Sequence, residues 1–216
     1  MKEQANITLR NECYRKLLHL SSLWIPILIW NTGSEITLWV LIPLTLLALI
    51  IEFLRRHNPV IAKIYSHMWH KILREHETGT TAKPQFSGGV WMLLAATIAT
   101  ALFPPLIAIT SLSVMMISDT VAALVGRRWG KYPFLDKSLE GSSAFFISAL
   151  LITSIIGAMA EQPPLFFTLG AVAALIATTV EAISKRLHID DNLSITLSFG
   201  FTILILEELL LSAPVP

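Results

Sequence analysis

The segment Ser118–Phe145 concentrates the residue types that bind phosphate groups. Gly126 and Gly130 allow the backbone to turn close to a ligand. A helix expected to begin near Ser142 offers free N–H groups and the positive end of its dipole. The cations and polar residues around them are Arg127, Arg128, Lys131, Lys137, Ser138, Glu140 and Gly141. The segment is not a Walker A loop, because its two glycines are one residue too close and Tyr132 stands where Ser or Thr is required.

Charged residues at the ends of apolar runs form a second candidate set. Asp119 is the clearest, because it lies within an apolar run where an ionisable group is costly and marks a functional site. The others at the corresponding ends of their runs are Lys16, His19, Glu52, Glu181, Asp190 and Asp191. We expect this set to converge on one site. The alternative is that some of these charges simply occupy the interface, where charges belong.

The elements that position these residues are apolar helices. Of 216 residues, 54% are apolar and 14% charged, whereas a soluble domain carries about 25% charged residues. The net charge of +1 indicates no polyanionic partner, so nucleic acid is excluded, and the single Cys13 excludes an internal disulfide. The sequence therefore predicts an all-α integral membrane protein with a single polytopic domain over residues 1–216.

Hydropathy predicts about seven transmembrane helices and one interfacial helix. The spans are expected near 14–31, 36–54, 86–103, 105–125, 142–160, 163–181 and 192–211. Pro104-Pro105 divides the third span from the fourth. For the first span a cleavable signal peptide is the alternative, although residues 31–34 lack the small-x-small cleavage pattern. Near 58–77, apolar residues recur at helical spacing opposite Lys and His residues, which predicts an amphipathic helix in the cytoplasmic interface.

The basic residues indicate the orientation of these spans. All 16 Lys and Arg residues fall in the N-terminal arm or in the connections after the second, fourth and sixth spans. Lys and Arg accumulate in cytoplasmic loops. The N-terminus is therefore expected inside and the C-terminus outside, with the candidate site facing the cytoplasm.

Taken together, the motifs resemble those of the polyprenol kinase family, which includes dolichol kinase, phytol kinase and the CTP-dependent diacylglycerol kinase of yeast. The central block reads Ser118-Asp119-Thr120-x-Ala122, Gly126-Arg127-x-x-Gly130-Lys131 and Lys137-Ser138-x-Glu140-Gly141-Ser142-x-Ala144-Phe145. The flanking pieces are Arg15-Lys16-x-x-His19, Glu52-x-x-Arg55, Glu181-x-x-Ser184 and Asp191-Asn192-Leu193. The resemblance covers Arg15 to about Leu197. Thr196 departs from it, since many relatives have Pro there, and the long N-terminal region of dolichol kinases is missing.

The resemblance implies a membrane enzyme that transfers the γ-phosphate of a nucleotide, typically CTP, to a lipid alcohol. The acceptor would be a polyprenol or dolichol, phytol or diacylglycerol, and Mg²⁺ or another divalent cation would assist. The family is also distantly similar to CDP-diacylglycerol synthases. The residues themselves do not distinguish the lipid or CTP from ATP, and they leave the oligomeric state open.

The resemblance also implies roles for the candidate residues. Asp119, Glu181 and Asp191 are the expected metal ligands, and Asp119, Glu181 and Lys137 are expected to act in catalysis. We favour Asp119 as a metal ligand and Glu181 as the base, although the reverse fits almost as well. The expected nucleotide- and phosphate-binding residues are Lys16, His19, Gly126, Arg127, Gly130, Lys131, Lys137, Ser138, Glu140, Gly141 and Ser142. Glu52, Arg55 and Asn192 are the remaining site residues.

Two other classes of function are alternatives to a kinase. A cytidylyltransferase of the phosphatidate type would form a CDP-lipid and release pyrophosphate. A membrane carrier would have polar residues through the full depth of several helices, whereas here the charges gather at one side. A membrane scaffold would have no need of Asp119.

Overall fold

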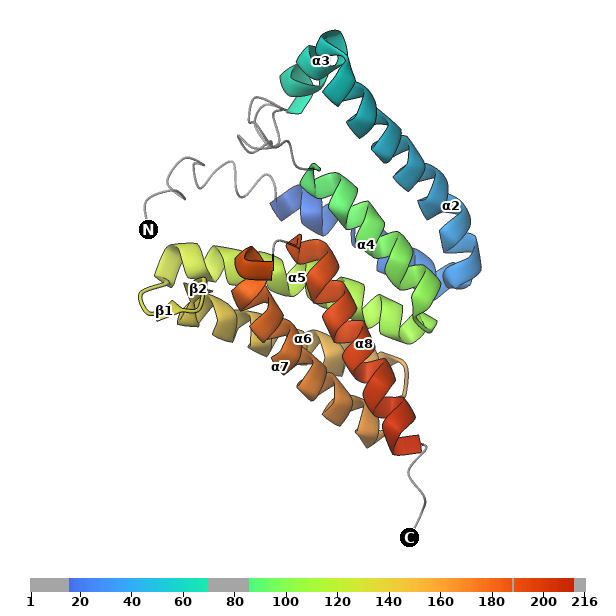
Figure 1. Ribbon diagram of the computed structural model, residues 1–216. Helices are drawn as coiled ribbons and strands as arrows, with labels where there is room; N and C mark the ends of the chain where they lie inside the picture. The colour runs from blue at the N-terminus through green and yellow to red at the C-terminus, as the bar shows by residue number, and fades with distance from the viewer. Residues whose placement is uncertain (1–15, 70–85, 188, 212–216) are drawn as a thin grey trace.

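The computed structural model describes residues 16–69, 86–187 and 189–211 (Figure 1). These residues are helical apart from short connections and one small hairpin, so the predicted all-α fold is confirmed. Arg15, residues 14–15 of the first expected span, residues 70–77 of the expected interfacial helix and residues 212–216 lie outside the described part.

The first two expected spans form one bent helix. A helical segment at 16–21 leads into α2 (Trp24–His57), which is continuous except at Gly33. Gly33 has φ 81° and ψ 172°, a region open essentially to glycine alone. In Figure 1 two arms meet at this bend, and the outer arm leads to α3 (Pro59–Trp69). The expected loop between the two spans is therefore reduced to a single residue.

The bend at Gly33 predicts the effect of a substitution there. A Cβ at Gly33 would meet no atom within 4 Å, so Gly33→Ala adds conformational strain without a steric clash. We expect it to lower the free energy of unfolding by about 1–3 kcal/mol. The measurement is thermal unfolding in detergent, with Gly89→Ala as the control, because Gly89 is helical and equally open. Equal melting temperatures for the two variants would contradict the prediction.

The remaining five helices form a bundle, and α5 is the central helix of that bundle. They are α4 (Gly88–Leu102), α5 (Pro105–Trp129), α6 (Leu139–Met159), α7 (Pro164–Leu187) and α8 (Asp191–Leu211). Pro104 caps α5 and Pro105 opens it, as expected from the proline rule for helix starts. Helix α5 contacts α2, α4, α6 and α8. Most of its apolar stretch is buried, so residues on α5 are held from several sides.

The structure is that of a membrane protein. Among the described residues, five helical stretches are long and apolar enough to cross a membrane, counting Lys16–His57 as one. The outer arm of α2 exposes large apolar side chains, such as Trp39 at 76% and Phe53 at 61%, which suits a lipid environment. Helix α4 has 15 residues, fewer than the roughly 20 of a full span. The expected count of seven spans stays a prediction.

A small hairpin joins α5 to α6. Strands β1 (Pro133–Phe134) and β2 (Lys137–Ser138) pair antiparallel, with Leu135 in the left-handed region at φ 51°. The Ser138 hydroxyl accepts a hydrogen bond from the Gly141 N–H at 3.2 Å. This cap lets α6 begin at Leu139, a turn earlier than expected. The Asp136 N–H donates to the carbonyl of Ala182 at 3.0 Å, which fixes the hairpin against α7.

Candidate active site

Asp119 lies on the central helix and is paired with the N-terminal segment. The Lys16 ammonium forms an ion pair with the Asp119 carboxylate and also donates to its carbonyl oxygen at 3.2 Å. His19 Nε2 lies 3.8 Å from the same carboxylate oxygen. The Lys16 side chain is only 3% exposed. Lys16 and Asp119, which are 103 positions apart in the sequence, therefore form a buried ion pair.

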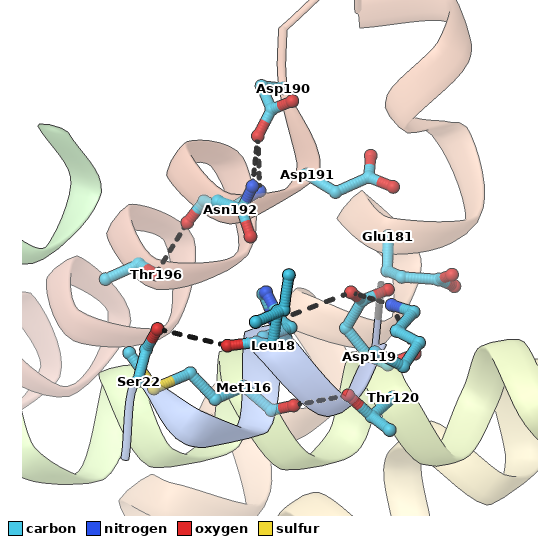
Figure 2. A network of polar contacts seen from close by, with 12 residues as sticks. Leu18, Ser22, Met116, Asp119, Thr120, Glu181, Asp190, Asp191, Asn192 and Thr196 are labelled. Carbon is cyan, nitrogen blue, oxygen red and sulfur yellow. Dashed lines mark hydrogen bonds and ion pairs between the residues drawn. The ribbon is translucent and has the colours of Figure 1, made fainter. Parts of the chain in front are cut away.

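Lys137 is the second cation of the site. From β2 its ammonium reaches Glu181 Oε1 on α7 at 2.9 Å and Asp191 Oδ2 at the start of α8 at 3.5 Å. Figure 2 shows Asp119, Glu181 and Asp191, from three helices, around one region. Burial alone would lower the pKa of Lys137, but the negative charges of Asp191, Glu181 and Asp119 raise it above its ordinary value. Lys137 therefore stays charged at physiological pH.

The Lys16–Asp119 pair and the triad of Lys137 with Glu181 and Asp191 form what we call the carboxylate–lysine cluster. Its members are Lys16, Asp119, Lys137, Glu181 and Asp191. They come from the N-terminal segment, α5, β2, α7 and α8. The ends of α5 and α7, the hairpin and the start of α8 lie on the same side of the bundle in Figure 1. The structure therefore brings together Lys16, Asp119, Glu181 and Asp191 of the set expected to converge, and Lys137 of the candidate phosphate loop joins them.

The three carboxylates of the cluster do not form a ready metal centre. Among the described residues, no group of three or more His, Cys, Asp or Glu side chains could hold a metal ion. The lysine ammonium groups bind these carboxylates instead. Mg²⁺ commonly binds one or two carboxylates together with substrate phosphates. A cation that arrives with phosphate would therefore fit one or two of these carboxylates. Glu181 Oε2 is buried and has no hydrogen-bond partner in the described part of the chain.

The glycines of the candidate phosphate loop allow α5 and α6 to approach closely. A Cβ on Gly141 would lie 3.1 Å from the Ala122 carbonyl oxygen and 3.3 Å from Gly126 Cα. A Cβ on Gly130 would lie 2.7 Å from the Ser138 hydroxyl. Small residues at these positions are therefore required by packing. Their contact with phosphate stays a prediction.

Glu140 shapes the same loop from the first turn of α6. Its carboxylate accepts hydrogen bonds from the backbone N–H groups of Lys131 at 2.9 Å and Tyr132 at 3.3 Å. The side chains of Arg127 and Lys131 are exposed at the end of α5 and just after it. Both cations are thus accessible to a ligand, while the acidic residue holds the backbone that carries Lys131.

The start of α8 is organised by local hydrogen bonds. The Asn192 amide donates to Asp190 Oδ1 at 2.7 Å. Thr196, where many relatives would have Pro, is buried and donates to the Asn192 carbonyl at 2.6 Å (Figure 2). The helix is continuous through this turn, so the departure at Thr196 leaves the start of α8 regular.

Glu52 and Arg55 form a separate cluster. The Glu52 carboxylate accepts from Arg55 Nε at 2.9 Å and from Arg56 at 3.0 Å. The Arg55 guanidinium lies 4.8 Å from the Tyr65 ring centroid, and Arg56 lies 4.5 Å from that of Phe86. No described contact joins this cluster to Asp119. The expectation that Glu52 converges with the other candidates is therefore not met: with Arg55 and Arg56 it connects α2 to α3 and to the residues just before α4.

Three serines that stand in the quoted motifs lie near the site, although only Ser142 was assigned a role from the sequence. The hydroxyls of Ser118, Ser142 and Ser184 are buried and lack a hydrogen-bond partner among the described residues. Each serine stands beside or one turn from a candidate residue: Asp119, Gly141 and Glu181, respectively. In the sequence these serines are marked only by their positions next to the candidate residues. Their burial in the structure is what singles them out. Ser142 alone had been proposed, as a phosphate-binding residue.

Relatives of the chain were found among curated proteins. An uncharacterized protein of Rickettsia prowazekii is 33% identical over 193 residues, covering 86% of this chain and 89% of the relative. CTP-dependent diacylglycerol kinase 1 of Schizosaccharomyces pombe is 30% identical over 145 residues, covering 64% and 63%. Probable phytol kinase 1, chloroplastic, of Oryza sativa is 38% identical over 102 residues, covering 43% and 32%. The chain thus spans less than two thirds of the two relatives named as kinases.

No protein-family model and no solved structure matches the chain significantly.

Proposed function

The chain belongs to the family that includes CTP-dependent diacylglycerol kinases and phytol kinases. From this family membership we propose that the protein transfers the γ-phosphate of CTP to the hydroxyl of a membrane lipid. The observation that carries the proposal is the carboxylate–lysine cluster, in which acidic and basic groups from five segments meet, with Lys16, Asp119 and Glu181 buried. Phosphoryl transfer asks a protein mainly for positioning and for neutralisation of charge.

In the proposed reaction Glu181 is the base. Its Oε1 accepts from Lys137, and its buried Oε2 has no partner among the described residues. Glu181 Oε2 accepts the proton of the lipid hydroxyl while the oxygen of that hydroxyl forms a bond to the γ-phosphorus. The bond between the γ-phosphorus and the bridging oxygen breaks, and its electron pair leaves with CDP. The products are the lipid phosphate, CDP and one proton.

The cations of the site bind the phosphates in this proposal. Lys137 and Lys16 neutralise charge on the triphosphate, with Arg127 and Lys131 at the accessible end of α5. The Gly141 N–H is bound to the Ser138 hydroxyl and the Leu139 N–H to the Tyr132 carbonyl, so the first turn of α6 would contribute the positive end of its dipole. Asp119 and Asp191 would hold Mg²⁺ together with phosphate oxygens. A divalent cation held there would neutralise the negative charge that develops on the phosphates.

We further propose that the site faces the cytoplasm in a seven-span topology. All 16 basic residues lie on one side of the predicted topology, and this bias supports an inside N-terminus. The kinked α2 would then cross twice, and α3 would lie in the cytoplasmic interface. The acceptor's hydroxyl would meet the nucleotide at the inner leaflet.

Position-specific labelling tests the proposed function. Purified protein in detergent with Mg²⁺ is given CTP labelled on either the γ- or the α-phosphate, with ATP as competitor. The acceptor panel contains 1,2-dioleoylglycerol, phytol and a polyprenol. The expected result is label from the γ position in one of these lipids. Label from the α position alone would instead establish a cytidylyltransferase, and no label from either would overturn both readings.

A further inference from the structure

Most buried hydroxyls on these helices donate to a carbonyl one turn earlier. Thr178 on α7 donates to Ala174 at 2.6 Å, and Thr120 on α5 donates to Met116 at 2.7 Å. Ser184, also on α7 and 2% exposed, makes no such bond with any described group. A buried polar group without a partner costs free energy. Packing alone therefore does not explain why a hydroxyl is buried at position 184.

Ser184 lies one turn after Glu181, whose Oε2 is the other unpartnered oxygen of α7. Residues three apart lie on the same face of a helix. Both side chains are buried, at 2% and 3% exposure. Glu181 is held through its other oxygen by Lys137. This face of α7 thus offers one hydroxyl that can donate and one carboxylate oxygen that can accept.

That pair of groups complements an alcohol. An alcohol oxygen accepts one hydrogen bond through a lone pair and donates one through its own proton. A free phosphate dianion would meet the Glu181 carboxylate unfavourably. A metal ion would find one carboxylate and a neutral hydroxyl, which is a poor donor set without phosphate. The hydroxyl of an alcohol can satisfy both the Ser184 hydroxyl and Glu181 Oε2.

We propose that Ser184 and Glu181 bind the hydroxyl of the acceptor lipid, with Ser184 as its positioning residue. The Ser184 hydroxyl donates to the alcohol oxygen, and the alcohol proton points at Glu181 Oε2. This arrangement aims the proton at the base before transfer begins. The inference rests on the proposed kinase function and adds the residue that orients the acceptor.

The test compares Ser184→Ala with Thr178→Ala, a buried hydroxyl on the same helix that is already satisfied. Steady-state kinetics are measured with whichever lipid of the labelling panel accepts phosphate. For Ser184→Ala we expect kcat/KM for the lipid to fall about five- to tenfold, the range of one lost hydrogen bond. The KM for CTP should stay unchanged. Thr178→Ala should leave both parameters unchanged.

A second readout separates orientation of the substrate from a structural role. Removing an unpartnered buried hydroxyl should not lower the melting temperature, so Ser184→Ala should melt at or above the wild-type temperature. The lipid alcohol should also stabilise the wild type more than its methyl ether does, and Ser184→Ala should lose that difference. Wild-type kinetics in Ser184→Ala, or a lowered melting temperature, would overturn the inference while the kinase stands. Absence of transfer by the wild type would overturn both.

Discussion

Asp119→Asn should abolish most of the turnover. The substitution keeps the size of the side chain but removes the negative charge proposed to hold the metal–nucleotide complex. Removing one preorganised charge contact from an active site costs about 10²–10³-fold in kcat, and we expect a loss at least that large. The γ-label assay measures it. Turnover within a few fold of wild type in folded protein would refute the role of the whole cluster.

Asp119→Asn also removes the partner of a buried cation. With Lys16 only 3% exposed, the loss of the carboxylate should cost about 3–5 kcal/mol of stability. The double variant Lys16→Met with Asp119→Asn serves as the control, because it removes both charges together. We expect it to recover much of the melting temperature and none of the turnover. Recovery of turnover would mean that instability alone explained the loss.

Glu181→Gln should lower kcat by about 10²–10⁴-fold, the usual contribution of a general base. Glutamine can still accept a hydrogen bond from Lys137 through its amide oxygen, but it cannot take the acceptor's proton. The KM for CTP should therefore change little. Single-turnover transfer with saturating CTP measures the chemical step directly.

The control for Glu181→Gln is Glu207→Gln, the same substitution at an exposed carboxylate. Glu207 lies near the C-terminal end of α8, away from the site. We expect that variant to behave as wild type. If Glu181→Gln kept more than about a tenth of kcat, the base would have to be sought elsewhere, with Asp119 the next candidate. Together, the Asp119 and Glu181 variants assign the two carboxylates.

Hydropathy and proline placement predicted most of the helices because they depend on local sequence. Pro105 opens α5, and the apolar runs after Ser138, Pro163 and Asp190 are helices. The bend at Gly33 was located to within a few residues, but its backbone conformation was not foreseen. A glycine between apolar runs is compatible with either a loop or a kink, and packing of the two arms decides between them.

The members of the site were predicted more readily than their partners. Asp119 and Glu181 are conspicuous because charges in apolar runs are expensive. The pairing of Lys16 with Asp119 depends on packing between segments 103 residues apart, which no local pattern encodes. Glu52 looked equivalent in the sequence, yet its own helix supplies the arginines that bind it. Ser184 stands in the motif Glu181-x-x-Ser184 but was given no role, because a serine in a motif does not indicate one until its burial is known.

The hairpin between α5 and α6 limits how the sequence can evolve. Its strands are two residues each, and Lys137 reaches Glu181 from the second. Because side chains alternate along a strand, inserting or deleting one residue before Lys137 would turn its ammonium to the opposite side. The backbone bond from Asp136 to Ala182 would be lost with it. Homologues that keep the same chemistry should therefore tolerate substitutions in residues 131–136 but contain no insertions or deletions there.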